Sequence, residues 1–344
     1  MKVAKLYRFN DIRIEEMPVP SVGPRDALIR TKACGICSGD VMPWYIEKKA
    51  PLVIGHEPAG EVVALGREAE TSLRPGDRVF VHHHAPCLHC RFCARGDYVQ
   101  CATWRKTRIE PGGISEYILV PEVNLLNDTL RLPDTLGYEE GTLVEPAACV
   151  VKSLRRSSLR RGDTVLLIGL GVMGQMHVLL AREFGARTVI GADRVPFRLN
   201  KALELGADHV VDVSQESLAD RVRELTGGSM AEIVIVGPNS VAAMEQGIQT
   251  AAPGGTVVFF TPARPGELLT VDPNDLYFRD ITLVTSYSCG PDDTRHALDF
   301  MERGIISAEK IVTHRFSLSG AGEAYRLTAE AKESLKCLIV FDGV

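Results

Sequence analysis

Residues Thr164–Gly174, TVLLIGLGVMG, join an apolar run to a G-x-G-x-x-G pattern, and this stretch determines the fold of the chain around it. The aliphatic residues predict a buried strand, and the glycines predict a turn into a helix. Gly169 permits the tight turn, Gly171 lets backbone amides approach a pyrophosphate, and Gly174 allows helix and strand to pack closely. Val172 and Met173 complete the loop. The pattern predicts a dinucleotide site where the helix dipole favours negative charge.

The coenzyme preference is predicted from the end of the next apolar run, Thr188–Asp193, TVIGAD. At this position the carboxylate of Asp193 can accept both hydroxyls of the adenosine ribose and repel a 2′-phosphate, which favours NAD over NADP. Arg194 and Arg198 leave the alternative open, because a guanidinium can pair with that phosphate or stack on adenine. Asp193 could also simply cap the end of its strand.

The two halves of the chain differ in the kinds of secondary structure that their sequences predict. Residues 148–288 alternate strand-like and helix-like segments, which predicts a parallel, doubly wound sheet and places the protein in the α/β class. Residues 1–147 hold short β-type runs separated by Gly and Pro, which predicts a mainly β domain. Residues 289–344 are expected to return to that domain. The apolar stretch Val165–Ala181 is interrupted by glycines and polar residues, so a strand and helix are expected there rather than a membrane span.

Composition excludes several classes of protein. The chain has 344 residues, of which 45% are hydrophobic and 24% charged, as in folded proteins of more than one domain. A formal net charge of -5 offers no general attraction to nucleic acid or anionic lipid. The N-terminus, MKVAKLYRFN, lacks the apolar core of a signal peptide, so a cytoplasmic protein with reduced cysteines is expected.

Four of the nine cysteines form a lobe, predicted over about residues 82–105, with the spacing C-x2-C-x2-C-x7-C. Four thiolates this close in sequence can surround one tetrahedral zinc ion and leave no open position, which predicts a structural role. An iron–sulfur cluster favours a last gap of three residues followed by Pro, whereas here Ala102 follows a gap of seven. The expected ligands are Cys87, Cys90, Cys93 and Cys101.

A second metal position is predicted from two motifs, ACGICSGD with Cys37 and VIGHEPAGEVV with His56 and Glu57. A thiolate, an imidazole and a carboxylate suit a catalytic zinc, which keeps an exchangeable position. Glu145 in VEPAAC is a candidate fourth ligand.

Two other interpretations of these motifs stay open. Glu145 could begin a helix, because Pro146 suits the first helical position. Cys34 and Cys37 form a C-x-x-C pattern, which is also that of redox dithiols.

Taken together, these motifs resemble those of the zinc-containing medium-chain dehydrogenases, nearest in pattern to the sorbitol (polyol) and threonine dehydrogenase branches. The resemblance covers essentially the whole length. The matching motifs are CGIC at 34–37, GHE at 55–57, the four-cysteine lobe, PGGISEY at 111–117, EP at 145–146 and GLGVMG at 169–174.

The resemblance implies a GroES-like catalytic domain, completed by the C-terminal residues, and a Rossmann NAD-binding domain. It implies that Cys37, His56 and Glu57 bind the catalytic zinc, with Glu145 as an alternating ligand or a partner of the zinc-bound water. With the lobe, two zinc ions per chain are expected. A homodimer or homotetramer acting on a small alcohol is also implied.

The predicted reaction is transfer of a hydride from a secondary alcohol, such as a polyol, a sugar-derived alcohol or an amino alcohol, to NAD. Zinc would lower the pKa of the substrate hydroxyl, and the nicotinamide would accept the hydride. Two alternatives stay open. One is an aldehyde or ketone reductase that uses NAD(P)H, and the other is a dinucleotide-binding sensor without catalysis.

The proton relay is where the chain departs from the family. Family members usually carry Ser or Thr two residues after the catalytic Cys and often a His three further on, but here these are Gly39 and Met42. Ser38, one residue early, is the remaining hydroxyl candidate. The run His82–His84 could offer a substitute carrier on one face of a strand, or be only a polar strand end. Candidate walls of the substrate pocket, or core residues, are Trp44, Tyr45 and Trp104.

Overall fold

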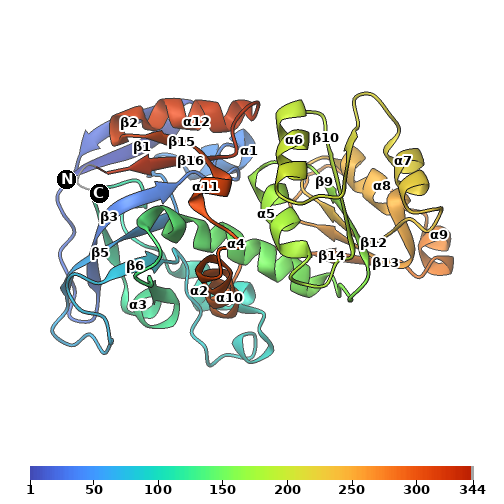
Figure 1. Ribbon diagram of the computed structural model, residues 1–344. Helices are drawn as coiled ribbons and strands as arrows, with labels where there is room; N and C mark the ends of the chain where they lie inside the picture. Colours follow the sequence, from blue (N-terminus) through green and yellow to red (C-terminus); the bar gives the residue numbers. More distant parts are fainter. Residues whose placement is uncertain (342–344) are drawn as a thin grey trace. The chain divides into compact units, whose positions relative to one another are not determined.

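The computed structural model describes residues 1–341 and divides into two compact units. Unit 1 combines Met1–Ala148 with the chain from Cys289 onward, and unit 2 is Cys149–Ser288. The last three residues of the segment predicted over 289–344 lie outside the described range. Figure 1 shows the ribbon of both units.

Unit 2 is built on a six-stranded sheet in the order β11-β10-β9-β12-β13-β14, and all neighbouring strands are parallel. The strand order reverses between β9 and β12, which is where a doubly wound sheet binds its ligand. The strands are β9 (Thr164–Ile168), β10 (Thr188–Asp193), β11 (His209–Asp212), β12 (Ala231–Val236), β13 (Ala251–Phe259) and β14 (Thr282–Thr285). The α/β class predicted from the alternating segments is confirmed.

Helices cover both faces of this sheet (Figure 1). Alternate residues of β9 explain why, since Val165 and Leu167 pack with one set of helices while Leu166 packs with the other. The first set is α5 (Val172–Ala181) and α6 (Pro196–Glu204), and the second is α7 (Leu218–Leu225) and α8 (Val241–Thr250). The short helix α9 spans Pro273–Phe278. Within residues 1–341, no helix is both long and apolar enough to cross a membrane.

Unit 1 is mainly β, with a seven-stranded sheet ordered β15-β16-β3-β5-β6-β8, in which β7 also pairs with β3. A smaller sheet has the order β2-β1-β4. The strands are β1 (Lys2–Arg8), β2 (Asp11–Glu16), β3 (Ala27–Gly35), β4 (Leu52–Val53), β5 (Glu57–Leu65), β6 (Arg78–Val81), β7 (Tyr117–Val120), β8 (Thr129–Arg131), β15 (Val312–Phe316) and β16 (Lys336–Val340).

Short helices connect these strands. Those before unit 2 are α1 (Pro43–Ile46), η1 (Glu47–Lys49), η2 (Cys93–Arg95), η3 (Tyr98–Gln100), α2 (Ala102–Lys106) and α3 (Glu122–Asp128). Those after it are α10 (Pro291–Glu302), α11 (Ala308–Ile311), η4 (Leu318–Gly320) and α12 (Ala321–Glu330). The long helix α4, Tyr138–Arg156, runs across the boundary between the units.

The closing segment belongs to unit 1 by its pairing. Strand β16 lies antiparallel to β3, and α12 packs on β2, β15 and β16. At the start of α10, the Tyr98 hydroxyl of the cysteine lobe donates to Asp292 at 2.7 Å. Residues from the two ends of the chain therefore share one core, which includes Leu6, Ile36 and Ile339.

Two of the alternatives that the sequence left open do not hold. Glu145 and Pro146 do not begin a helix, because α4 starts at Tyr138 and carries Pro146 in its interior. The run His82–His84 does not alternate across a strand, because β6 ends at Val81 and the three histidines follow it in an irregular segment. The run therefore agrees with the other alternative, a polar strand end.

Candidate active site

A cluster of metal-donating side chains forms where β3 ends and β5 begins. Cys37, His56 and Glu57 each offer a ligand atom, and these atoms all lie within 4.8 Å of one another. Gly55 has φ +90°, and a Cβ there would meet Ile114 at 2.5 Å, so this turn requires glycine. A thiolate, an imidazole and a carboxylate at this spacing fit one zinc ion with a position left for substrate.

Asp40 orients the imidazole, and the sequence patterns did not reveal it. Its carboxylate lies 3.0 Å from Nδ1 of His56, and the carboxylate is buried. Burial opposes a charge on His56, but the negative charges of Asp40 and Cys37 and their hydrogen bonds outweigh it and hold the pKa of His56 well above its usual range. Because Asp40 faces Nδ1, Nε2 is the ring nitrogen that would bind a metal, and the metal would displace the proton there. The signal in the sequence was the Asp at the end of ACGICSGD.

Lys336 is the second residue that the sequence patterns did not reveal. Its ammonium forms an ion pair with Glu57, and both side chains are fully buried. Nζ also donates to the carbonyl of Ile36 at 3.1 Å. Burial lowers the pKa of Lys336, but the Glu57 carboxylate more than offsets this and raises it, so the lysine stays charged. Gly35 makes room for the pair, since a Cβ there would lie 2.0 Å from Glu57 Oε2.

The interpretation of Cys34 and Cys37 as a redox dithiol finds no support. The Cys34 side chain is fully buried, and burial raises the pKa of its thiol to about 12. A thiol of that pKa is a poor nucleophile. Both cysteines are free, and Cys37 accepts the N–H of Gly39 at 3.3 Å.

Ser38 lies in the turn after Cys37 and is exposed to solvent. At the family position of the hydroxyl, residue 39, a Cβ would lie 3.4 Å from the sulfur of Cys37, so a side chain there would sit against the cluster. The relay role considered for Ser38 therefore has no support from its placement.

Glu145 lies in a neighbouring group rather than in the Cys37 group. Its carboxylate, His82 and His83 offer ligand atoms within 4.8 Å of one another. The ring of His83 is 4.7 Å from that of His56, measured between centroids, so the two groups adjoin. Burial lowers the pKa of His83 well below its usual range.

The cysteine lobe has the geometry of a zinc site. Sγ of Cys87 lies 4.0 Å from that of Cys93 and 3.6 Å from that of Cys101, and Cys90 lies 3.5 Å from Cys93. Four sulfurs around a tetrahedral zinc are about 3.8 Å apart, so these spacings fit. Burial raises the pKa of Cys101, but hydrogen bonds from the backbone of Cys87 and Trp104 outweigh it and lower that pKa to about 6. The thiolate that zinc requires is therefore favoured there.

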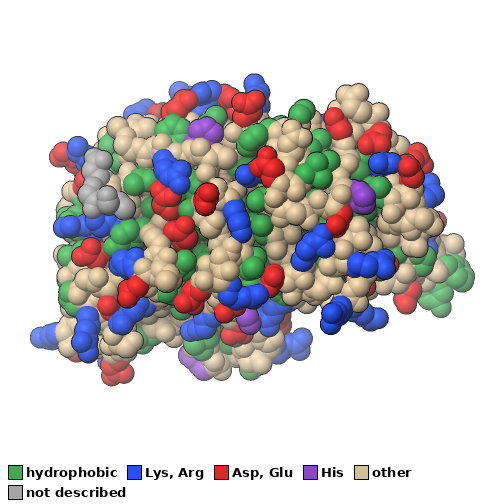
Figure 2. Space-filling view, viewed as in Figure 1, with side chains coloured by type: hydrophobic (Ala, Val, Ile, Leu, Met, Phe, Trp, Pro, Cys, Tyr) green, Lys and Arg blue, Asp and Glu red, His purple; other side chains and the backbone are tan. Residues whose placement is uncertain are grey.

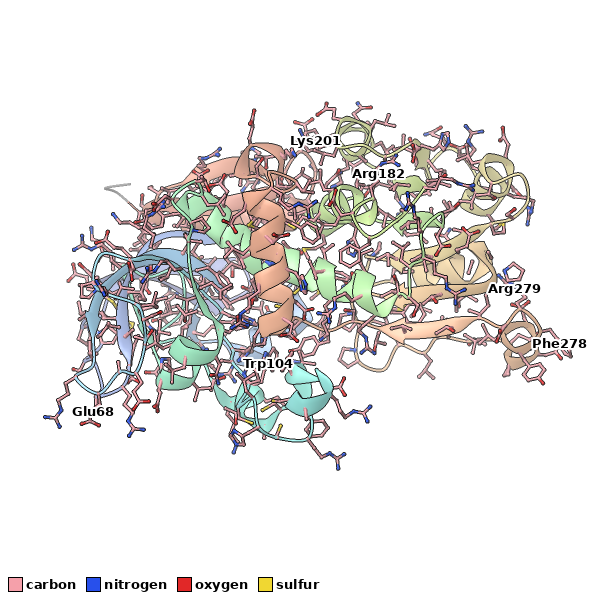
Figure 3. The ribbon with its side chains drawn as sticks, turned by 60° about the horizontal axis from the view of Figure 1, so that its bottom comes forward. Glu68, Trp104, Arg182, Lys201, Phe278 and Arg279 are labelled. Carbon is pink, nitrogen blue, oxygen red and sulfur yellow. The ribbon has the colours of Figure 1, made fainter. Side chains whose placement is uncertain are left out.

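Of the three aromatic residues considered as walls of the substrate pocket, one lies in the core and two remain candidates. Trp104, labelled beside the lobe in Figure 3, is 2% exposed and packs with Cys93, Val99 and Cys101. It belongs to the core of the lobe. Trp44 and Tyr45 form an edge-to-face pair on α1 with centroids 5.8 Å apart. These two are half-buried and remain candidates for the substrate pocket.

In unit 2, the glycine loop follows β9 as predicted, and α5 begins at Val172. Gly169 has φ +89°, and a Cβ at Gly174 would lie 2.1 Å from the carbonyl oxygen of Gly169. At Gly171 the nearest atom to a Cβ is the Arg198 guanidinium at 4.0 Å. The backbone there faces open space, and Gly171 has no side chain to cap the helix amides. Such a loop suits a pyrophosphate.

Asp193 ends β10 beside this loop. Its carboxylate accepts the N–H groups of Leu170 at 2.7 Å, Arg194 at 2.7 Å and Val195 at 3.0 Å. Arg198 Nη1 lies 3.7 Å from the same carboxylate, whereas the Arg194 side chain is exposed. The capping role is therefore present, and the negative charge is fixed at the end of the strand.

Comparisons with known proteins agree with both units. Residues 23–134 match the alcohol dehydrogenase GroES-like domain, and residues 172–303 match the zinc-binding dehydrogenase domain. Sorbitol dehydrogenase of Mus musculus is 31% identical over 96% of this chain and 93% of its own. The chain belongs to the zinc-containing medium-chain alcohol dehydrogenases. The resemblance seen in the sequence motifs is thereby confirmed.

Solved structures extend this result for the dehydrogenase. The 2R,3R-butanediol dehydrogenase of Bacillus subtilis has 28% identity and a TM-score of 0.87, covering 98% of this chain and 99% of its own. A zinc-binding dehydrogenase of Sinorhizobium meliloti 1021 bound to NADP has 28% identity and a TM-score of 0.87, covering 98% of each chain. The predicted GroES-like and Rossmann folds are confirmed, and the chain is a zinc-dependent alcohol or polyol oxidoreductase that uses a nicotinamide dinucleotide.

The buried pair between Lys336 and Glu57 leads to a stability prediction. Lys336→Met leaves the Glu57 carboxylate buried without its partner, and we expect the free energy of unfolding to fall by about 3–5 kcal/mol. Urea unfolding followed by circular dichroism measures this. Lys332→Met, at an exposed lysine nearby, is the matched control and should change stability by less than about 0.5 kcal/mol. Equal effects of the two variants would contradict a buried pair.

Ser38→Ala tests the remaining hydroxyl candidate for the proton relay. Because Ser38 is exposed, we expect the pH dependence of kcat to be the same in the variant and the unchanged dehydrogenase. Steady-state rates over a pH series provide the comparison. A shift in the pH dependence of kcat in Ser38→Ala would contradict this expectation and would indicate that Ser38 takes part in proton transfer.

Proposed function

We propose that this dehydrogenase oxidises a secondary hydroxyl of a small polyol, sugar-derived alcohol or amino alcohol and passes the hydride to NAD. The observation that carries the proposal is the convergence of Cys37, His56 and Glu57, with ligand atoms within 4.8 Å, in a chain of the zinc dehydrogenase family. The similarity to sorbitol and butanediol dehydrogenases supports a substrate with neighbouring hydroxyls.

Each residue of the site has a part in this proposal. Cys37, His56 and Glu57 would hold the catalytic zinc, which when bound supplies a Lewis acid that lowers the pKa of a substrate hydroxyl. Asp40 keeps the imidazole in one orientation through the 3.0 Å contact with Nδ1. Lys336 holds Glu57 in place by a buried ion pair. A second zinc would close the cysteine lobe.

The coenzyme is proposed to be NAD. The backbone at Gly171 and the start of α5 would receive the pyrophosphate, and Asp193 would face the adenosine ribose. To accept ribose hydroxyls, the carboxylate would have to share or exchange its bonds to the loop amides. Its negative charge would still repel a 2′-phosphate.

The reductase alternative has one observation in its favour. Arg194 is exposed next to Asp193, and a similar structure carries NADP, so the same site could run toward reduction with NADPH. A sensor without catalysis is not favoured, because the chain retains the whole donor set of the catalytic cluster together with Asp40 and Lys336.

We infer a homodimer or homotetramer from the edge of the unit 2 sheet. β14 ends the sheet, and beside it Tyr277 and Phe278 are 78% and 77% exposed. Phe278 is labelled at the surface in Figure 3, and hydrophobic side chains gather over α9 in Figure 2. An exposed strand edge flanked by aromatic residues is typical of a subunit interface. A reducing compartment such as the cytoplasm would keep all nine free cysteines available.

Cys37→Ala tests the metal mechanism. Loss of the thiolate should remove one zinc ion per chain and lower kcat by more than about 100-fold, because substrate polarisation depends on that ion. Zinc analysis and a coupled assay with sorbitol, xylitol, inositols, threonine and butanediol provide the measurements. A Cys37→Ala protein with full turnover would contradict the proposed function.

Asp193→Ser tests the coenzyme. Loss of a charged acceptor for the ribose hydroxyls should lower kcat/KM for NAD by about 10–100-fold and relax the preference against NADP. Initial rates with both coenzymes measure the ratio. Tighter use of NADP than of NAD by the unchanged protein would overturn the assignment.

A further inference from the structure

Two cationic side chains, Lys49 and Arg108, lie near the Cys37 group, and the proposed mechanism uses neither of them. Lys49 is the last residue of η1, and Arg108 lies two residues after the end of α2. Both residues are exposed, and both belong to unit 1. In the part of the chain that the structure describes, neither side chain forms a hydrogen bond or an ion pair. The protein therefore supplies no counter-ion for either charge.

Lys49 is connected to the catalytic cluster through Tyr45. Its Nζ lies 3.6 Å from the centroid of the Tyr45 ring, which is a cation–π contact. Burial lowers the pKa of Lys49, and the negative charge of Asp40 opposes this shift. Among the weaker influences, Arg108 lowers that pKa and Cys37 raises it. Lys49 therefore lies within electrostatic reach of both the catalytic cluster and the second cation.

Arg108 is connected to the same cluster through the histidines that follow β6. The carbonyl of Thr107, the residue before Arg108, lies 2.5 Å from Nδ1 of His84. The ring of His83 is 4.2 Å from that of His84 and 4.7 Å from that of His56, measured between centroids. This row of contacts leads from Arg108 to one of the proposed ligands of the catalytic zinc.

Within the cluster, the buried carboxylates already have partners of opposite charge. Asp40 lies 3.0 Å from Nδ1 of His56, and Glu57 forms its ion pair with Lys336. The two exposed cations have no such partner, and a zinc ion held by the cluster would add further positive charge. A local excess of positive charge attracts an anion and stabilises it once bound.

We propose that the substrate of this dehydrogenase carries an acid group, a carboxylate or a phosphate, and that Lys49 and Arg108 bind this group. The inference rests on the proposed function, since it concerns the alcohol that the Cys37 group would oxidise. An ammonium is a compact point charge, and a guanidinium presents paired N–H donors, so both suit the oxygens of such a group. Sugar acids, phosphorylated polyols and hydroxy amino acids fit this chemistry, whereas a neutral polyol leaves both cations without a partner.

Three six-carbon compounds, sorbitol, gluconate and sorbitol 6-phosphate, test the proposal with NAD as coenzyme, because they differ in the group at one end of the chain. We expect kcat/KM for gluconate or for sorbitol 6-phosphate to exceed that for sorbitol by about 10-fold or more, since only these two offer an anion to the cations. The compound with the higher value distinguishes a carboxylate from a phosphate. Added sodium chloride should reduce the preference, because salt screens exposed charges.

Lys49→Met and Arg108→Met test the two cations separately. Each should lower kcat/KM for the preferred anionic substrate by about 10–100-fold and change that for sorbitol by less than about 3-fold, because sorbitol has no charge to bind. Unchanged rates with sorbitol also show that the variants are folded. The matched controls are Lys48→Met and Lys106→Met, which remove neighbouring exposed charges and should leave both values unchanged.

Values of kcat/KM for both acid-bearing compounds at or below the value for sorbitol would overturn the proposal. Equal losses with sorbitol and with the anionic substrate in Lys49→Met and Arg108→Met would overturn it too, as would equal losses in the control variants. The proposed function fails on a separate result, full turnover by Cys37→Ala, so the two failures are distinguishable.

Discussion

The register between β3 and β5 is the constraint on which the catalytic cluster depends. Gly35, the last residue of β3, lies opposite Glu57, the first residue of β5. Cys37 therefore comes just past the end of one strand, and His56 just before the start of the other. β16 pairs with the other edge of β3, with Leu338 opposite Gly35, and this brings Lys336 to the same point. Three segments far apart in sequence thus meet through backbone pairing.

That pairing also sets the electrostatics of the site. A buried carboxylate is costly unless a cation faces it, and Lys336 supplies that cation without competing for the thiol or the imidazole. Asp40, in the turn after Cys37, supplies the opposite charge for His56, with its carboxylate 3.0 Å from Nδ1. Two of the three metal-donating side chains, His56 and Glu57, are therefore each held by a buried residue of opposite charge. A metal bound there would find these ligands already oriented.

The sequence predicted what depends on local spacing. The four-cysteine lobe, the glycine loop and the parallel sheet follow from residues close in the chain, and each has the expected form. Lys336 could not be found this way, because nothing near it in sequence indicates that it meets Glu57, and only sheet pairing brings them together. The grouping of His82 and His83 with Glu145 could not be predicted for a similar reason, since it joins the segment after β6 to a residue of α4. The choice of coenzyme and of substrate depends on contacts between the protein and those molecules, and the spacing of residues in the sequence does not predict such contacts.

The most direct measurement is a zinc-edge anomalous difference map from crystals of the purified protein, with the cysteine lobe as the internal reference. If Cys37 and His56 hold the catalytic zinc, the map contains a peak within bonding distance of the Cys37 sulfur and the His56 imidazole. A map that shows the lobe peak but no density between these two side chains would contradict it.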